Sequence, residues 1–309
     1  MRILFMGTPD FAAIILEYLA KSEHEIVGAI SQPDKPKGRG HKLMPTDVKV
    51  TAQKYGIPVF QPETLKNNAV KELLCELHPD MIVVAAYGKL LPDYVIDYPE
   101  YGCINVHPSL LPKYRGAAPI QWAVLNGDRE TGVAIMRMDY GLDTGDTIEV
   151  KKYEIGEYET SGELFDRLAH ESGKILLEAV ERVFNGTAVY TKQEGDGSYA
   201  PMIDKTMAEI DWSKSNSRVL SLILGMNPFP QAFTTYKGQT LKITEAVKTD
   251  AHGKPGEILG LEKNKGLLVA CGEGGLYLKT VQFAGSKRMN VEDYARGHEI
   301  ENGVILGAE

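Results

Sequence analysis

Met-Ile-Val-Val-Ala-Ala at residues 81–86 is a continuously apolar stretch in a chain of 309 residues. A short apolar run without alternating polar residues is typical of a strand that is buried on both faces of a parallel sheet. Similar runs precede and follow it, and most of them are separated by amphipathic segments. The strands predicted from these runs are Ile3–Met6, Ile26–Ile30, Val59–Phe60, Met81–Ala86 and Cys103–Val106.

The amphipathic segments between these strands predict helices over Phe11–Ala20, Thr46–Tyr55 and Glu63–Leu77. Alternating strands and helices indicate βαβ crossovers. They predict an α/β fold with a Rossmann-like, mostly parallel sheet and helices on both faces. Ligand sites of such sheets lie at the carboxyl ends of the strands.

The rest of the chain predicts two further regions. A helix at 121–125, a strand pair at 132–138 and 147–153, and a long helix at 162–184 complete a first domain over residues 1–190. Residues 191–206 are rich in Gly, Asp and Lys, with few apolar residues, which favours a linker.

Residues 207–309 contain one short helix and about five short strands with turns between them. This pattern predicts a C-terminal OB-like β-barrel domain. The net charge of the chain is −8, but residues 207–309 carry as many basic as acidic side chains. The negative net charge, which lies before residue 207, argues against indiscriminate binding to polyanions. The equal numbers of basic and acidic side chains in residues 207–309 permit a nucleic-acid contact there.

The composition, with 43% hydrophobic and 25% charged residues, is that of a globular protein. Cys75, Cys103 and Cys271 lie far apart in the sequence, which predicts buried thiols in a reducing compartment rather than disulfides. The sequence contains no apolar leader and no apolar stretch of membrane-spanning length. We therefore expect a cytoplasmic protein without a membrane partner.

Two polar motifs predict the chemistry. Asn105 and His107 are two residues apart at the end of a predicted strand, so both side chains lie on the same side. Asp143 lies in Gly-Leu-Asp-Thr-Gly-Asp at 141–146, on a sharp turn between two strands. An amide and an imidazolium that converge with a carboxylate suit the attack of an amine on a carbonyl group. The first two stabilise the oxyanion and the carboxylate transfers the proton.

Other sites find little support in the sequence. Gly7 lies at a strand-to-helix turn, but no dinucleotide or P-loop glycine pattern surrounds it. Ser109 lacks the Gly-x-Ser-x-Gly elbow of a serine hydrolase. The seven histidines lack metal-ligand spacing, so no metal is expected.

The segment 32–49 is basic and rich in proline and glycine, which predicts a loop without regular structure. It is either a solvated loop or a mobile arm that contacts a phosphate backbone, with Arg39 between two glycines. A long loop inside a compact domain usually has a function. The basic side chains are Lys35, Lys37, Arg39, Lys42 and Lys49.

At these motifs the sequence closely resembles the folate-dependent formyltransferase family, and within it the methionyl-tRNA formyltransferases. The resemblance covers nearly the whole chain. It rests on the segments Met-Gly-Thr-Pro-Asp-Phe, Gly-Arg-Gly-His-Lys-Leu-Met-Pro, Ala-Tyr-Gly-Lys-Leu-Leu-Pro, Cys-Ile-Asn-Val-His-Pro-Ser-Leu-Leu-Pro, Tyr-Arg-Gly-Ala-Ala-Pro-Ile-Gln, Met-Asp-Tyr-Gly-Leu-Asp-Thr-Gly-Asp and Ile-Asp-Trp.

The resemblance implies that a formyl group passes from 10-formyltetrahydrofolate to the α-amino group of methionine on initiator tRNA, at the start of translation. It assigns Asn105, His107 and Asp143 as the catalytic set. The folate-binding residues that it implies are Tyr87, Gly88, Leu90, Ser109, Leu110, Leu111 and Pro112. The tRNA-binding residues that it implies are Lys35, Lys37, Arg39, Lys42 and Lys205, with the C-terminal domain holding the inner face of the tRNA.

Two alternatives remain open from the sequence. A formyltransferase that acts on a small sugar-nucleotide or ribonucleotide amine would share the catalytic set but would not need the basic segment. A non-enzymatic RNA-binding protein would keep the fold without the chemistry, and the intact set argues against it. Nothing in the sequence requires more than a monomer.

Overall fold

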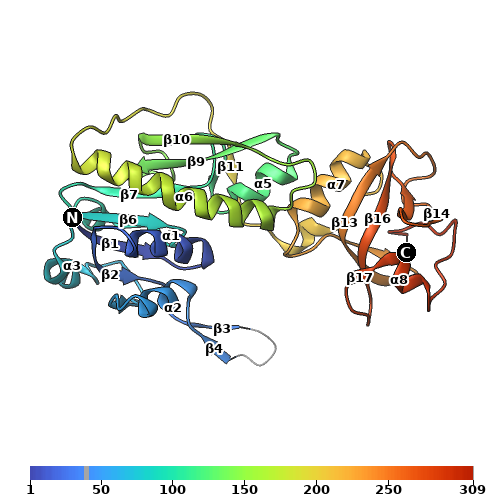
Figure 1. Cartoon of the computed structure of the whole chain (residues 1–309), viewed down its shortest axis with the longest axis horizontal. Helices are drawn as coiled ribbons and strands as arrows, with labels where there is room; N and C mark the ends of the chain where they lie inside the picture. Colours follow the sequence, from blue (N-terminus) through green and yellow to red (C-terminus); the bar gives the residue numbers. More distant parts are fainter. Residues whose placement is uncertain (38–41, 309) are drawn as a thin grey trace. The chain divides into compact units, whose positions relative to one another are not determined.

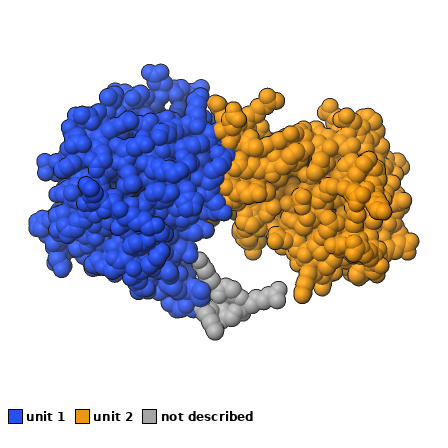
Figure 2. All heavy atoms as spheres, viewed as in Figure 1, with its two compact units in different colours: residues 1–119, 131–153, 165–201 blue, residues 120–130, 154–164, 202–309 orange. Residues whose placement is uncertain are grey.

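The computed structural model describes residues 1–37 and 42–308. The chain forms two compact units, which are coloured separately in Figure 2. Unit 1 consists of residues 1–119, 131–153 and 165–201, and unit 2 consists of residues 120–130, 154–164 and 202–309. The predicted limits of the domains, at residues 190 and 206, stay a prediction. In the structure, residues 191–201 pack with unit 1.

Unit 1 contains a seven-stranded sheet with the order β10-β9-β7-β6-β1-β2-β5 (Figure 1). The pairs from β7 through β6, β1 and β2 to β5 are parallel, whereas β9 runs antiparallel to β7. The mostly parallel sheet predicted from the apolar runs is therefore confirmed. Its strands are β1 (Arg2–Gly7), β2 (Glu25–Ile30), β5 (Val59–Phe60), β6 (Met81–Ala85), β7 (Cys103–His107), β9 (Glu130–Arg137) and β10 (Thr147–Glu154).

Helices pack against this sheet because its strands are apolar on both faces. Leu4 and Met6 of β1 lie in a buried cluster with Leu74. The alternating residues of β1 face the other side of the sheet, and α1 and α6 contact each other through Phe11 and Phe165. The helices of unit 1 are α1 (Asp10–Ala20), α2 (Asp47–Lys54), α3 (Lys71–Leu77), α4 (Asp93–Ile96) and most of α6 (Ser161–Phe184), whereas α5 (Pro119–Leu125) belongs to unit 2 from residue 120 on.

The predicted helix over Glu63–Leu77 is wrong in its first half. α3 begins only at Lys71, because Asn67 and Asn68 adopt the left-handed conformation, with φ angles of 56° and 59°. Asparagine tolerates this conformation better than most residues, and it ends regular structure there. Leu65, before the break, is still buried in the core.

The basic segment also differs from the prediction, because its two ends are regular. β3 (Lys35–Lys37) and β4 (Lys42–Met44) pair antiparallel. At the base of this pair, Asp34 accepts hydrogen bonds from Lys49 Nζ (2.6 Å) and Gln61 Nε2 (2.6 Å). The hydrogen bond from Gln61, followed by that from Lys49, lowers the pKa of the Asp34 carboxyl. The base is therefore anchored to the end of the sheet by charged hydrogen bonds.

Residues 191–201 are tied to unit 1 by backbone hydrogen bonds. Thr191 pairs antiparallel with Thr147, at the start of β10. β11 (Tyr199–Ala200) pairs with β8 (Arg115–Gly116), which follows the loop after β7. This segment therefore runs beside two loops of the α/β unit.

Unit 2 contains an antiparallel sheet with the order β12-β13-β16-β15-β14, and β17 pairs with β16. The antiparallel β domain predicted for the C-terminal part is confirmed, and its closure into a barrel stays a prediction. The elements are η1 (Lys205–Ala208), α7 (Asn216–Gly225), β12 (Phe233–Tyr236), β13 (Gln239–Thr249), β14 (Ile258–Glu262), β15 (Gly266–Ala270), β16 (Gly275–Phe283), β17 (Met289–Asn290) and α8 (Val291–Ala295). Within residues 1–37 and 42–308, no helix is both long and apolar enough to cross a membrane.

Candidate active site

The structure brings together the amide, imidazole and carboxylate that the sequence singled out. Asn105 Nδ2 lies 3.4 Å from Asp143 Oδ1, and His107 Nδ1 lies 3.6 Å from Asp143 Oδ2. Asn105 and His107 are only 9% and 4% exposed. They share one side of β7 because they are two residues apart on a strand. The three predicted side chains therefore form one buried polar cluster.

The hydrogen bond between His107 and Tyr114 shows which ring nitrogen of His107 carries a hydrogen. Nε2 lies 2.8 Å from the backbone oxygen of Tyr114. A carbonyl oxygen only accepts, so Nε2 carries the hydrogen in this contact. Nδ1 is then the nitrogen that faces Asp143. The loop after β7 thus holds the imidazole in one orientation.

Asp143 lies on the turn of residues 139–146, which joins β9 to β10 and is called the Asp143 turn below. Its φ angle is 52°, in the left-handed region, and its Oδ2 accepts a hydrogen bond from Gly116 N at 2.8 Å. Gly145 is required for the close approach of the turn to β9, since a Cβ there would lie 1.8 Å from the backbone oxygen of Arg137. The turn is thus built to aim one carboxylate at β7.

The predicted folate-binding residues lie on two segments that follow neighbouring strands. Residues 86–91 follow β6 and residues 108–112 follow β7, and these two strands pair in parallel. Both segments therefore leave the sheet at the same edge as Asn105 and His107.

Within the first of these segments, the Tyr87 side chain is buried in the core, which raises its pKa to about 12. Its backbone oxygen accepts hydrogen bonds from Thr8 Oγ1 and Gln32 Nε2, both at 2.9 Å. Gly88 has a φ angle of 81°, and Leu90 is 79% exposed. Ala86, Gly88 and Leu90 are thus the exposed residues of this segment.

In the second segment, the buried Ser109 donates its hydroxyl to the backbone oxygen of Lys113 at 2.6 Å. This bond stabilises the loop itself. Leu110, Leu111 and Pro112 are each partly exposed. These apolar side chains line the loop immediately after His107.

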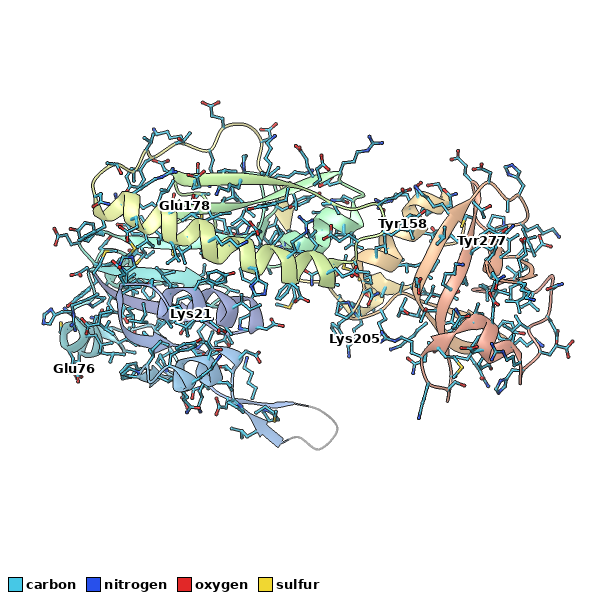
Figure 3. The ribbon with its side chains drawn as sticks, in the orientation of Figure 1. Lys21, Glu76, Tyr158, Glu178, Lys205 and Tyr277 are labelled. Carbon is cyan, nitrogen blue, oxygen red and sulfur yellow. The ribbon has the colours of Figure 1, made fainter. Side chains whose placement is uncertain are left out.

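The predicted tRNA-binding residues lie in both units. Lys35 is exposed and donates to Gln32 Oε1 at 3.1 Å. Lys37 and Lys42 lie on the strands β3 and β4, and Arg39 lies outside the described residues. Lys205, which is labelled in Figure 3, belongs to unit 2, and its ammonium lies 5.8 Å from the ring centroid of Phe229.

The sequence did not indicate a role for Gly116 and Gln193, which donate hydrogen bonds to Asp143, or for Arg115, which donates to Gln193. Gln193 lies 50 residues after Asp143 and 78 after Arg115. No local pattern could have indicated these contacts, because they depend on how distant loops fold together. In the part of the chain that the structure describes, no group of three or more His, Cys, Asp or Glu side chains could hold a metal ion.

Two family models match the two parts of the chain. A family model described as "Formyl transferase" matches residues 1–180. A second one, described as "Formyl transferase, C-terminal domain", matches residues 202–299.

Full-length relatives are also similar. The methionyl-tRNA formyltransferase of Alkaliphilus oremlandii is 46% identical over 310 residues, covering 99% of this chain and 100% of the relative. That of Acetivibrio thermocellus is 47% identical over 311 residues, again covering 99% of this chain and 100% of the relative.

Among solved structures, an N-formyltransferase from Helicobacter canadensis has the same fold. It was crystallised with folinic acid and dTDP-3-aminofucose, and it aligns with a TM-score of 0.66 at 19% identity. The alignment covers 93% of this chain and 99% of that chain.

Proposed function

Because this chain belongs to the methionyl-tRNA formyltransferase family, we propose that it formylates the α-amino group of methionine on initiator tRNA. The formyl donor in this proposal is 10-formyltetrahydrofolate, and the chain acts as a monomer. The observation that carries the proposal is the convergence of Asn105 and His107 with Asp143 at the end of β7.

In the proposed reaction the free amine attacks the formyl carbon and forms a C–N bond. The carbonyl electrons move to oxygen, and Asn105 stabilises this oxyanion with an N–H of its amide. The bond between the formyl carbon and the folate nitrogen then breaks. Hydrogen bonds aimed at a developing oxyanion are among the strongest contributions to catalysis of acyl transfer.

His107 and Asp143 divide the remaining tasks. His107 Nε2 is engaged by the oxygen of Tyr114, so Nδ1 faces the reacting groups and, when protonated, assists Asn105. Asp143 accepts the proton that the attacking amine loses and passes it, through water, to the departing folate nitrogen. Atoms and charge balance without a further reactant.

In this proposal, the two substrates bind to segments around Asn105, His107 and Asp143. The folate lies along residues 86–91 and 108–112, which leave the same edge of the sheet. The β3–β4 segment, with Lys35, contacts the phosphates of the tRNA acceptor end. The β domain with Lys205 contacts the inner face of the tRNA.

The test supplies the purified full-length protein with 10-formyltetrahydrofolate and one acceptor at a time. The acceptors are charged initiator tRNA, the same tRNA without methionine, and a set of amino-sugar nucleotides. We expect formyl-methionine only with the charged tRNA, detected by mass spectrometry after release of the amino acid. Formylation of the amino-sugar nucleotides alone would overturn the proposed acceptor while leaving formyl transfer intact.

A further inference from the structure

Gln193 contacts the Asp143 turn from a segment that is distant in sequence. Its Nε2 donates one hydrogen bond to the backbone oxygen of Asp143 at 2.9 Å and another to that of Gly145 at 2.8 Å. Both N–H bonds of the amide are therefore used on the turn that carries the carboxylate. Residues 138–146 belong to no helix or strand, and within the turn Asp139 Oδ1 accepts hydrogen bonds from Gly141 N at 3.0 Å and Thr144 Oγ1 at 2.6 Å.

The other end of the same amide is also engaged. Gln193 Oε1 accepts hydrogen bonds from Arg115 Nε at 3.2 Å and Nη2 at 2.7 Å. The residue after Arg115 is Gly116, whose backbone N–H donates to Asp143 Oδ2. Gln193 thus links the two loops that meet at the Asp143 carboxylate, and the contacts form a closed ring.

Gln193 is itself held in place on both sides. Two residues earlier, Thr191 exchanges backbone hydrogen bonds with Thr147, at 2.8 and 2.9 Å. Five residues later, the backbone oxygen of Ser198 accepts from Arg115 N at 2.8 Å. The amide is therefore presented from a short span that is anchored to β10 and to β8.

The conformation that Gln193 supports is an uncommon one. Asp143 has a φ angle of 52°, in the left-handed region that few non-glycine residues occupy, although Asp is found there more often than most. Such conformations persist where the surrounding contacts determine them. The two bonds from Gln193 act on the backbone of the turn, in addition to the bond from Gly116 N to the carboxylate itself.

We propose that Gln193 is a positioning residue for Asp143: it holds the turn so that the carboxylate meets the reacting groups, without touching substrate itself. This proposal rests on the proton-transfer role of Asp143 in the proposed function. A misplacement of about 1 Å at a reacting group lowers the rate by up to about a hundredfold.

Two substitutions whose side chains resemble glutamine in shape test the two ends of the Gln193 amide separately. Gln193→Met removes all four hydrogen bonds, whereas Gln193→Glu keeps the acceptor for Arg115 and removes both donors to the turn. For both we expect kcat to fall about tenfold or more, with KM for each substrate within about twofold. Glu194→Gln, at the exposed neighbouring position, is the matched control, and its kcat stays unchanged. Melting temperatures establish that all three variants are folded.

A second measurement asks whether Gln193 acts through Asp143. Under single-turnover conditions, we expect Gln193→Met to slow the Asp143→Asn enzyme by less than about twofold, because residues that act as a unit are not additive. An undiminished kcat in both Gln193 variants, or an equal loss in the Asp143→Asn background, contradicts the positioning role. Wild-type turnover by Asp143→Asn alone contradicts the proposed function instead, so the two failures are distinguishable.

Discussion

At the scale of single residues, His107 uses its two nitrogens for different purposes. Nε2 binds the oxygen of Tyr114, and Nδ1 faces Asp143 at 3.6 Å. The 3.6 Å separation is longer than a direct hydrogen bond. Asn105 makes a similarly long contact of 3.4 Å to the same carboxylate. Catalytic hydrogen bonds are often long before substrate binds, and the long contact of Asn105 leaves its amide N–H groups available for the oxyanion of the proposed reaction.

Alanine substitutions test the three side chains separately. We expect Asn105→Ala to lose about a hundredfold in kcat, the usual cost of removing one oxyanion donor. His107→Ala and Asp143→Ala should lose formyl transfer as well. Circular dichroism and melting temperature should show folded protein in each case. Asn185→Ala, at the exposed end of α6, serves as the control with unchanged kcat. Near-wild-type turnover by Asp143→Ala would remove the proton-transfer role.

At the scale of elements, the sequence predicted what depends on local pattern. The predicted limits agree with the observed ones to within one or two residues for β1, β2, β6 and β7. Continuous apolar runs indicate buried strands, so these strands could be predicted. Asn105 and His107 could be paired because strand geometry relates residues i and i+2. The short α3 could not be predicted, since the left-handed Asn67 depends on its particular context. The Gln193 contacts could not be predicted because they join segments 50 or more residues apart.

The contact between α1 and the end of α2 gives a pH-dependent prediction. Glu17 on α1 accepts a hydrogen bond from Tyr55 (2.8 Å) and pairs with Lys21 (2.7 Å). Lys21 and Tyr55 lower the pKa of Glu17 from 4.5 to about 2. The ionised form is therefore favoured by folding. The stabilisation is complete above pH 4.5 and is lost as the pH falls towards 2.

Glu17→Gln should therefore lower the melting temperature at pH 7, and the difference from wild type should shrink below pH 4.5. The side chains of Lys21 and Lys54 are each 62% exposed and that of Glu17 is 33% exposed, so screening limits the loss to about 1 kcal/mol or less. Calorimetry across this pH range measures it. Glu76→Gln, at an exposed position on α3 (Figure 3), is the control. A difference that is equally large at pH 7 and at pH 2.5, a value about half a unit above the lowered pKa, would count against the ion pair.

At the scale of the whole molecule, each unit has its own core and its own buried thiol. Cys103 lies in the sheet of unit 1, and Cys271 lies in unit 2, after β15. Burial raises the pKa of both thiols, that of Cys271 to about 12. Cys75 on α3 is exposed. The expectation of buried thiols is therefore wrong for Cys75, and the two buried thiols, Cys103 and Cys271, report on the opening of the two units separately.

Alkylation should follow this difference in exposure, since the thiolate is the reactive form. With iodoacetamide at about pH 8, a little below the ordinary thiol pKa, we expect Cys75 to react first in the native protein. Cys103 and Cys271 should react only in denaturant. Peptide mass spectrometry over time measures the order of labelling. Early labelling of Cys271 would mean that unit 2 opens under native conditions.

The ring of contacts through Gln193 has a consequence for synthesis of the protein. The ribosome produces the Asp143 turn 50 residues before it produces Gln193. A nascent chain that ends before residue 191 contains every strand of the seven-stranded sheet, yet it lacks the Gln193 amide that we propose positions the carboxylate. On these proposed roles, we expect formyl transfer to require synthesis beyond residue 193, and chains that end before residue 191 to lack it.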